Sequence, residues 1–516
     1  MRSGPDRIDR RGFLGTLAVA TVVSACGTGA PAGPGPGPTS GPPSVPLTIP
    51  PSPAGTATAA RPRRSLLDVR FAEAHRSHPV ELVAPGFVLV DLVVGDRVAG
   101  ESREEVALPA PFVGIEVEVD DPGDATLVAG LTSADRRTGV HVTLDPHRGE
   151  AELVLVVEGR ASSLASERVS LPGAAFTLGF ALCENRATAF VRSGQGGWQV
   201  LVSGRSGIAD RLDLRDPRTL ATMGAHWGAR SGACRVSRVR AGLFGMTGLR
   251  DPHLVQHADG RPYVEGGRHF VTWTCAGPGF FQQAHWGVFA LDPADPAAME
   301  QVAQIYTRRD GLLLGDHAGQ LVRDGDRWLV ANTSWGDFDG SGVHVRATTS
   351  TADLLHGVHV IETTPVALPT DLDTWDPSLT RIDGAWQWAY VESPSQSPFD
   401  FHPALARTGA ADPFTALTAV ASDRGRHQTE GTVLVRDTDR WLLLASDGDA
   451  REYPVYDLRL RRVGRLAAPY GSNIPHPQVL VDDDGRWLVV TFDGTNPFAD
   501  RLGYGGHGDV VVLRER

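Results

Sequence analysis

Residues 316–330 read Asp-His-Ala-Gly-Gln-Leu-Val-Arg-Asp-Gly-Asp-Arg-Trp-Leu-Val. A short apolar run leads into the turn Asp324-Gly325, and a second apolar run begins at Trp328. Asp-Gly supplies the positive φ angles that a tight hairpin needs, so this stretch predicts two antiparallel strands. The aspartate of the turn is then structural.

The same phrase occurs five times between residue 249 and the C-terminus. Each copy opens with a polar residue at its head, and the copies span residues 250–255, 316–322, 375–379, 429–434 and 475–480. Four copies carry a tryptophan just past the turn, namely Trp328, Trp386, Trp441 and Trp487. We interpret these tryptophans as fillers between adjacent sheets. The period predicts an all-β fold with a five-bladed β-propeller.

The composition narrows the class of protein. The chain has 516 residues with 59 Gly and 37 Pro, which favours short strands and turns over helical repeats. Its net charge of −12 argues against a nucleic-acid partner, which would need a basic face. The sequence contains no lysine, which excludes Schiff-base chemistry on this chain.

The N-terminus reads as an export signal. A twin-arginine pair, Arg10-Arg11, precedes the apolar run 14–25, and Cys26 follows in a context that resembles a bacterial lipobox. We expect Cys26 to be lipidated, although an ordinary signal peptide with an incidental cysteine remains an alternative. The Gly-, Pro-, Ser- and Thr-rich residues that follow cannot bury a core and predict a disordered tether. The protein is therefore expected outside the cytoplasmic membrane, anchored to it as a lipoprotein.

Short alternating strands continue from about residue 65 to 247. Examples are residues 113–119, 139–144 and 151–157, and their spacing predicts a β-sandwich. The order of the later strands resembles a concanavalin-type jelly roll. Such a domain either binds a polymer or packs against its neighbour. The predicted domains are a signal peptide at 1–26, a linker at 27–62, a β-sandwich at 63–247 and the propeller at 248–516.

Two cysteines fall in the predicted sandwich. Cys183 and Cys234 would form a plausible disulfide in an oxidising compartment, and two buried free thiols are the alternative.

Carboxylates dominate the polar heads of the five copies. The innermost strand of a propeller blade begins at one rim of the central channel, so the heads should converge there. The heads are Asp251, Asp316 (shifted by about two residues), Asp376, Glu430 and His476. Carboxylates that lie close together in a partly desolvated channel repel one another, so they would not be expected if their only role were to stabilise the fold. This pattern suits acid/base chemistry on a hydroxyl-rich substrate, or metal binding.

With these heads, residues 249–516 resemble the five-bladed β-propeller glycoside hydrolases, which include arabinanases, β-xylosidases, arabinofuranosidases and, more distantly, invertases. In that group an Asp heads the first blade, a second Asp follows two blades later, and a Glu heads the next. Asp251-Pro252, Asp376-Pro377 and Glu430-Gly431 match this order. The chain departs from the group after the glutamate, where Gly-Thr replaces the usual Gly-Pro.

The resemblance implies a role for each carboxylate. Glu430 would be the general acid that protonates the departing oxygen. Asp251 would be the ionised carboxylate that activates water or attacks the anomeric carbon. Asp376 would orient the sugar and tune Glu430.

The remaining candidates have two interpretations each. In arabinanase-like members a histidine of the last blade faces a channel ion, commonly calcium and usually through water, so His476 would be a metal ligand or a hydrogen-bonded substrate or core residue. The chemistry itself requires no cofactor. Asp316 and His317 would contact substrate or satisfy the backbone of the funnel. Trp335, Trp375 and His285 would stack on sugar faces or pack beneath loops.

These observations lead to a functional hypothesis. We expect a monomeric, surface-tethered glycoside hydrolase that cleaves a polysaccharide or oligosaccharide, with an arabinan-like, pentofuranose-containing polymer as the first candidate. It would have no nucleic-acid partner. The alternative is a non-catalytic carbohydrate-binding lipoprotein of the cell envelope.

Overall fold

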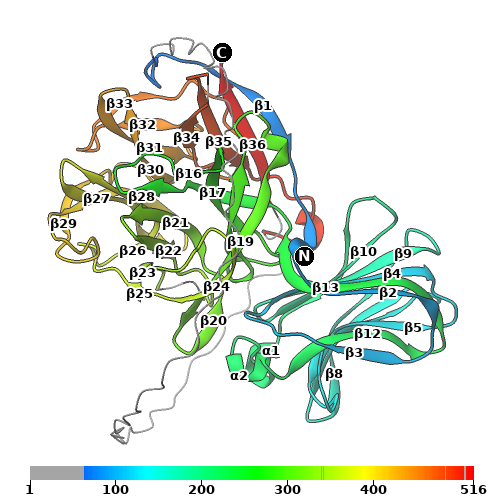
Figure 1. Cartoon of the computed structure of the whole chain (residues 1–516). Helices are drawn as coiled ribbons and strands as arrows, with labels where there is room; N and C mark the ends of the chain where they lie inside the picture. Colours follow the sequence, from blue (N-terminus) through cyan, green and yellow to red (C-terminus); the bar gives the residue numbers. More distant parts are fainter. Residues whose placement is uncertain (1–62, 339, 341, 483, 505–506) are drawn as a thin grey trace, which may run out of the picture. The chain divides into compact units, whose positions relative to one another are not determined.

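The computed structural model describes residues 63–338, 340, 342–482, 484–504 and 507–516. This part of the chain consists almost wholly of antiparallel sheets (Figure 1). The predicted signal peptide 1–26, with Cys26, and the linker 27–62 lie outside the described residues. Within the described ranges, no helix has the length and apolar character that crossing a membrane requires.

Five sheets form the blades of the predicted propeller. Blade one contains β14 (Leu249–Leu254), β17 (Arg268–Cys275), β18 (His285–Leu291), β19 (Glu300–Arg309) and β20 (Leu312–Leu314), with β16 (Val264–Glu265) and β24 (Gly357–Glu362) attached. Blade two contains β15 (Gln256–His257), β21 (His317–Asp324), β22 (Arg327–Thr333), β23 (Val345–Ser350) and β25 (Thr364–Pro365). Blade three contains β26 (Asp373–Ile382), β27 (Ala385–Gln396), β28 (Phe399–Thr408) and β29 (Thr418–Ser422). Blade four contains β30 (Thr429–Asp437), β31 (Arg440–Asp447), β32 (Pro454–Tyr456) and β33 (Arg462–Arg465). Blade five contains β34 (Gln478–Val481), β35 (Trp487–Asp493), β36 (Asp509–Glu515) and β1 (Phe71–Ser77).

Two further sheets precede the first blade. One has the order β11 (Gln199–Gly204), β10 (Arg186–Arg192), β9 (Phe176–Cys183), β4 (Phe112–Asp121), β13 (Cys234–Met246) and β2 (Glu81–Val98). The other has the order β3 (Glu101–Glu105), β12 (Met223–Ser231), β5 (Thr126–Ser133), β6 (Gly139–Asp145), β7 (Glu150–Val157) and β8 (Arg160–Arg168). Residues of both sheets, among them Ile115, Leu178, Leu127 and Leu153, share one hydrophobic core.

The helices of the described residues are single turns. They are α1 (Ile208–Arg211), α2 (Pro217–Leu220), α3 (Ala499–Leu502) and the 3₁₀ turns η1 (Phe281–Gln283) and η2 (Pro296–Ala298).

The two ends of the described chain meet in blade five. Strand β1 pairs antiparallel with β36, from Phe71 opposite Glu515 to Ser77 opposite Val510. Figure 1 shows this blue strand beside the red one. The segment predicted as the start of the sandwich therefore begins with a strand that belongs to a propeller sheet. This pairing closes the ring, and β1 supplies the outer edge of the last blade.

A β-bulge lies at the head of the innermost strand in blades one to four. The register shifts between Arg250 and His253, His317 and Gln320, Trp375 and Ser378, and Glu430 and Val433. The first bulged residue has positive φ in every case, 51° at Asp251, 46° at Ala318, 49° at Asp376 and 67° at Gly431. Ala318 is thus the true counterpart of Asp251, which explains the shift of about two residues seen at Asp316.

Three of the four tryptophans after the turns pack between adjacent sheets, as predicted. Trp328, Trp386 and Trp487 are buried, with at most 3 % of their surface exposed. An arginine lies over each ring, with the guanidinium carbon 4.3–5.1 Å from the ring centroid. Trp441 is half-buried at the edge of blade four.

The disulfide predicted between Cys183 and Cys234 is wrong, because both are buried free thiols. Cys183 pairs with Phe112 at one end of β4, whereas Asp121 at the other end pairs with Arg235, the residue after Cys234. That strand has 10 residues. Its ends lie roughly 30 Å apart at about 3.3 Å per residue, while a disulfide needs Cα atoms within about 7 Å.

Truncating Phe71 tests the closure of the ring. Its ring is 5 % exposed in the core between blades four and five, so Phe71→Ala should lower the free energy of unfolding by about 3 kcal/mol or more. Val93→Ala is the control, because Val93 is 86 % exposed and its truncation should cost about 0.5 kcal/mol or less. Denaturant unfolding of the two variants measures the difference. Equal stabilities would show that β1 does not hold the last blade.

Candidate active site

A pocket of about 140 Å³ lies among the heads of the innermost strands, and we call it the central pocket. Its polar lining consists of Arg250, Asp251, His317, Asp376, Gln428, Glu430, Asn473 and His476. Its apolar and aromatic lining consists of Phe281, Trp335, Trp375, Phe399, Phe401, Ile474 and Tyr504. Aromatic walls around a few converging polar groups are typical of a ligand-binding site.

The bulges decide which side chains reach the central pocket. The residue just before the bulge is Arg250, His317, Trp375 or Glu430 in blades one to four, and all four line the pocket. The next residue also lines it in blades one and three, where it is Asp251 and Asp376. Glu430 therefore occupies a different repeat position from the two aspartates. Its side chain is 15 % exposed, against 5 % for each aspartate.

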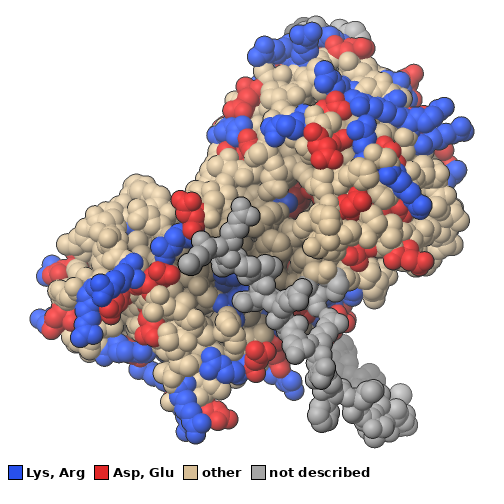
Figure 2. All heavy atoms as spheres, turned by 180° about the vertical axis from the view of Figure 1, so that it is seen from behind, with Lys and Arg blue, Asp and Glu red and all other residues tan. Residues whose placement is uncertain are grey.

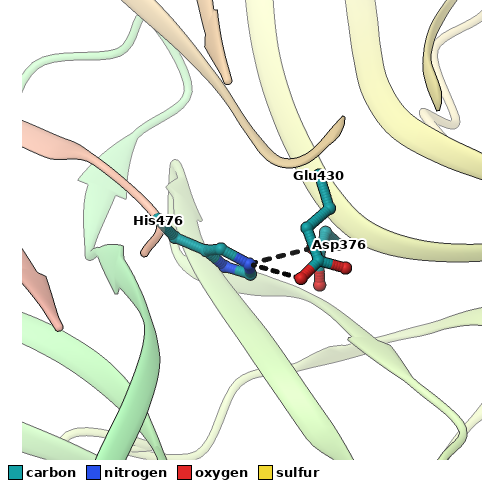
Figure 3. A group of neighbouring side chains, drawn as sticks. All are labelled: Asp376, Glu430 and His476. Atoms are coloured by element: carbon teal, nitrogen blue, oxygen red, sulfur yellow. Dashed lines mark ion pairs between the residues drawn. The ribbon is translucent and has the colours of Figure 1, made fainter. Parts of the chain in front are cut away.

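His476 lies close to three carboxylates, two of which, Asp376 and Glu430, Figure 3 shows beside its ring. Its Nε2 is 3.4 Å from Asp376 Oδ2 and 3.7 Å from Glu430 Oε1. Its Nδ1 is 3.7 Å from Asp251 Oδ1. The imidazole thus separates Asp251 from the other two carboxylates.

The electrostatic environment favours ionised Asp251. Burial opposes ionisation, but Arg250 and His476 outweigh it and hold the pKa of this carboxyl below its usual range. Arg250 Nε lies 3.1 Å from Asp251 Oδ2 and also hydrogen-bonds to Oδ1. The guanidinium is in turn held by the hydroxyl of Tyr504 and by His507.

The pKa values of Asp376 and His476 are both raised. Burial raises the pKa of Asp376 above its usual range, and the neighbouring Glu430 and Asp251 reinforce this against the opposing effect of His476. Burial lowers the pKa of His476, but Asp376, Glu430 and Asp251 dominate and raise it to about 9. His476 is therefore an imidazolium at neutral pH.

A backbone amide holds Asp376 in place, and a side-chain indole holds Glu430. Asp376 Oδ2 accepts a hydrogen bond of 3.0 Å from the amide of Gly431, and the indole nitrogen of Trp375 donates to Glu430 Oε2 over 3.0 Å. Gly431 also gives His476 room, because a Cβ there would lie 2.4 Å from the imidazole. A side chain at Gly431 would displace His476 from the carboxylates.

Four of the other predicted site residues line the central pocket, namely His317, Trp335, Trp375 and His476. His317 is neutral near pH 7, because burial lowers its pKa to about 4. Its Nε2 lies 2.6 Å from the carbonyl oxygen of Phe281. The ring of Trp335 lies 4.4 Å from that of Phe281 and 5.5 Å from that of Trp375.

Asp316 and His285 do not reach the central pocket, which corrects the expectation of a substrate contact. Asp316 is fully buried, where it pairs with Arg309 at 3.1 Å and accepts a hydrogen bond from the amide of Gly336. It therefore anchors the loop that carries Trp335. His285 is also fully buried, where its ring is stacked on Tyr306 and packs at a tilt against Phe112.

The sequence had not suggested several pocket residues. Arg250 precedes Asp251 in the first copy of the repeat. If the copies are aligned on their bulges, Arg250 takes the position that Glu430 has in the fourth copy. Tyr504, Phe281 and Phe399 lie in or beside irregular connections, where no period marks them. Such positions are found only when the chain is folded.

The carboxylate cluster around His476 offers part of a ligand set for a metal ion. Asp376, Glu430 and His476 each offer one ligand atom, and these atoms lie within 4.8 Å of one another. They supply two carboxylates and one imidazole, whereas Ca²⁺ takes 6–8 oxygen ligands, so water would have to complete the shell. An imidazolium has no lone pair for a metal. Calcium binding at His476 stays a prediction.

No family model and no curated protein matches this sequence. Among solved structures, the chain is similar to a GH43_1 enzyme from Xanthomonas citri, with 16 % identity, a TM-score of 0.36 and coverage of 51 % of this chain and 88 % of that one. A family 117 glycoside hydrolase from Zobellia galactanivorans matches at 12 % identity and a TM-score of 0.36, over 52 % of this chain and 84 % of that one. An α-L-arabinanase of Penicillium chrysogenum, complexed with arabinobiose, matches at 10 % identity and a TM-score of 0.35, over 85 % and 98 %. At identities and TM-scores this low, the similarities do not assign an activity to this chain.

The ionisation of His476 can be measured directly. Replacing Asp376 by Asn removes the carboxylate that contributes most to the raised pKa, so the pKa of His476 should fall from about 9 toward the ordinary value of about 6.5. NMR titration of the imidazole resonances measures this shift. Asp310→Asn is the control, because that side chain is 78 % exposed and should leave the titration unchanged.

The same shift links pH to stability. A pKa raised in the folded state stabilises the protein fully below about 6.5, and this stabilisation is lost as pH rises through about 9. If the pKa of His476 is the same in Asp376→Asn as in the wild-type protein, Asp376 is not the main cause of the raised pKa.

Proposed function

We propose that this protein is a glycoside hydrolase whose reaction takes place in the central pocket. One observation carries the proposal: Asp251, Asp376 and Glu430 converge around His476 inside an aromatic-walled pocket. Hydrolysis of a glycosidic bond needs two carboxyl groups in different protonation states. The surroundings of these carboxylates differ in the way that such chemistry requires.

Asp251 is suited to the role of the ionised carboxylate. The guanidinium of Arg250 and the imidazolium of His476 hold it in the charged form, so it can activate water or attack the anomeric carbon. It lies on the other side of the imidazole from Glu430, and both carboxyl groups line the central pocket.

Glu430 is suited to the role of the general acid. It is the most exposed of the three carboxyl groups, so its oxygens can reach a departing glycosidic oxygen. Trp375 orients the carboxyl through the indole N–H. Asp376 lies deeper and is committed to the amide of Gly431, so we assign it to binding sugar hydroxyls and to tuning Glu430.

The lining of the central pocket supports a neutral, hydroxyl-rich substrate. Trp335 and Phe399 offer aromatic surface against which the C–H face of a sugar can pack. The single arginine in the lining, Arg250, already pairs with Asp251. On the exterior, both basic and acidic side chains occur on the face that Figure 2 shows.

The proposal also covers the substrate of the enzyme and its location in the cell. We propose a polysaccharide or oligosaccharide substrate, with an arabinan-like, pentofuranose-containing polymer first, and a monomeric enzyme. The twin-arginine pair and the lipobox-like sequence at Cys26 support export and attachment to the cell membrane through a lipid. The second candidate function, a non-catalytic glycan-binding lipoprotein, would use the same aromatic walls.

Removing the acid distinguishes the two functions. Glu430→Gln keeps the shape of the side chain but carries no transferable proton, so kcat should fall by about 10²–10⁴-fold while binding of oligosaccharide persists. Product analysis on arabinan, xylan and other cell-wall polysaccharides measures sugar release, and calorimetry measures binding. The exposed Glu265 gives the matched control Glu265→Gln. If wild-type protein binds a glycan but releases no sugar from the panel, the enzyme proposal fails.

The pH profile tests the role of Arg250. Asp251 must be ionised to act, and its lowered pKa keeps the acid limb of kcat/KM at low pH. Arg250→Gln removes the main favourable charge, so the pKa of Asp251 should rise and the acid limb should move to higher pH. Arg308→Gln, at an exposed position of β19, serves as the control. If the acid limb of kcat/KM does not move in Arg250→Gln, Asp251 is not the ionised carboxylate of the reaction.

A further inference from the structure

A second and larger cavity, of about 690 Å³, lies on blade three, and we call it the blade-three cavity. Its polar base is built by Tyr390 and Glu392 from β27, His402 from β28 and Ser422 from β29. Glu392 and His402 are direct cross-strand neighbours, and so are Ala404 and Ser422 in the adjacent row. One face of the sheet therefore supplies the whole base.

The two cavities use opposite faces of the same strand. Successive side chains of a strand point to opposite faces. Along β28, Phe399 and Phe401 line the central pocket, whereas Asp400 and His402 line the blade-three cavity. Only the thickness of this sheet separates the two cavities there.

Glu392 at the base is a buried carboxylate with an unusual set of partners. It is 4 % exposed and accepts hydrogen bonds from Ser422 Oγ at 2.9 Å, from His402 Nε2 at 3.3 Å and from Thr370. Burial opposes ionisation, but these donors outweigh it and lower the pKa of Glu392. None of the donors is an arginine. An ionised carboxylate therefore lies at the bottom of an open cavity, held by hydroxyl groups and an imidazole.

Stability alone does not explain this arrangement. Buried charges are costly, and well-packed apolar side chains of the same size are often at least as stabilising. Among the described residues, the potential metal ligands that cluster closely are those of the central pocket, so the base of the blade-three cavity lacks a ligand set for a cation. Carboxylate, imidazole and phenol groups are partners for hydroxyl groups. The rim adds apolar surface from Pro369, Leu372, Pro394 and the 42 % exposed Val420.

We propose that the blade-three cavity is a second, non-catalytic binding site for a sugar unit, in which Glu392 and His402 bind its hydroxyl groups. The choice of a sugar rests on the proposed glycoside hydrolase function. The site holds either a unit of the polymer whose cleavage takes place in the central pocket or a short sugar released from it. Both sources share the chemistry of a neutral, polyhydroxylated ring, and a cavity of this volume accommodates such a ligand.

The test requires a protein whose central pocket no longer binds. In the full chain, Trp335→Ala together with Asp376→Asn removes an aromatic wall and a polar contact of that pocket. Into this background we would introduce Val420→Arg, which places a long cationic side chain at the rim and within reach of the acidic base. Val463→Arg is the matched control, because Val463 is 41 % exposed on β33 of blade four. Calorimetry with soluble arabinan, arabinobiose and xylotriose measures binding.

We expect the background protein to retain binding to at least one probe, Val420→Arg to weaken it about tenfold or more, and Val463→Arg to leave it unchanged. Binding of arabinan alone identifies the polymer as the occupant, and binding of the short sugars identifies a released fragment. Glu392→Gln should weaken binding in the same way, and thermal unfolding checks that the variant is folded. Loss of all binding in the background protein, or equal affinities of Val420→Arg and Val463→Arg, would overturn the proposal. Absence of sugar release by the wild-type protein would overturn the proposed hydrolase function, which is a separate result.

Discussion

The bulges at the heads of the innermost strands of blades one to four are the constraint on which the ring and the pocket both depend. A bulge frees one backbone amide from the strand ladder, and a buried amide must find another acceptor. The preceding blade supplies it: Thr274 for Ala318, Thr333 for Asp376, and Asp376 for Gly431. These contacts join blade one to two, two to three and three to four, and they hold the residues beside the bulges at the central pocket. The positive φ at Asp251 and Asp376 is strain of the kind found at functional sites.

The charge of His476 is the electrostatic counterpart of that geometry. Three carboxyl groups cannot share a buried space without a counter-charge, since each raises the pKa of the others. His476 supplies the charge from the fifth blade, and Gly431 leaves the space for its ring. Arg250 then distinguishes Asp251 from the rest, because the guanidinium pairs with this carboxylate alone. Asp376 and Glu430 have other partners, the amide of Gly431 and the indole of Trp375, so the three carboxyl groups stand in different surroundings.

The sequence predicted the features that repeat and missed those that do not. The Asp-Gly turns, the buried tryptophans and the heads Asp251, Asp376 and Glu430 follow a period, so the five-bladed arrangement and the pocket could be predicted. Asp316 kept the residue type of a head but lies two positions before the bulge, and this register is visible only in the paired strands. Cys183 and Cys234 looked compatible because distance along the sequence says little about distance along a sheet. The N-terminal strand β1 carries no repeat signal, since it completes a blade whose other strands end the chain.

That closing strand links the two ends of the chain to the chemistry between them. Segment 63–77 enters blade five before either of the six-stranded sheets begins, so those sheets are inserted between the last strand of the ring and the first. Loop-closure entropy grows only slowly with length, so a long insertion costs the ring little once its ends are held. His476 belongs to the connection that leads into blade five, and Asp251 to the first strand of blade one. The junction that β1 and β36 complete therefore brings together the imidazolium and the carboxylate that it helps to ionise. Ring closure is for this reason a condition of the charge pattern in the central pocket as well as of stability.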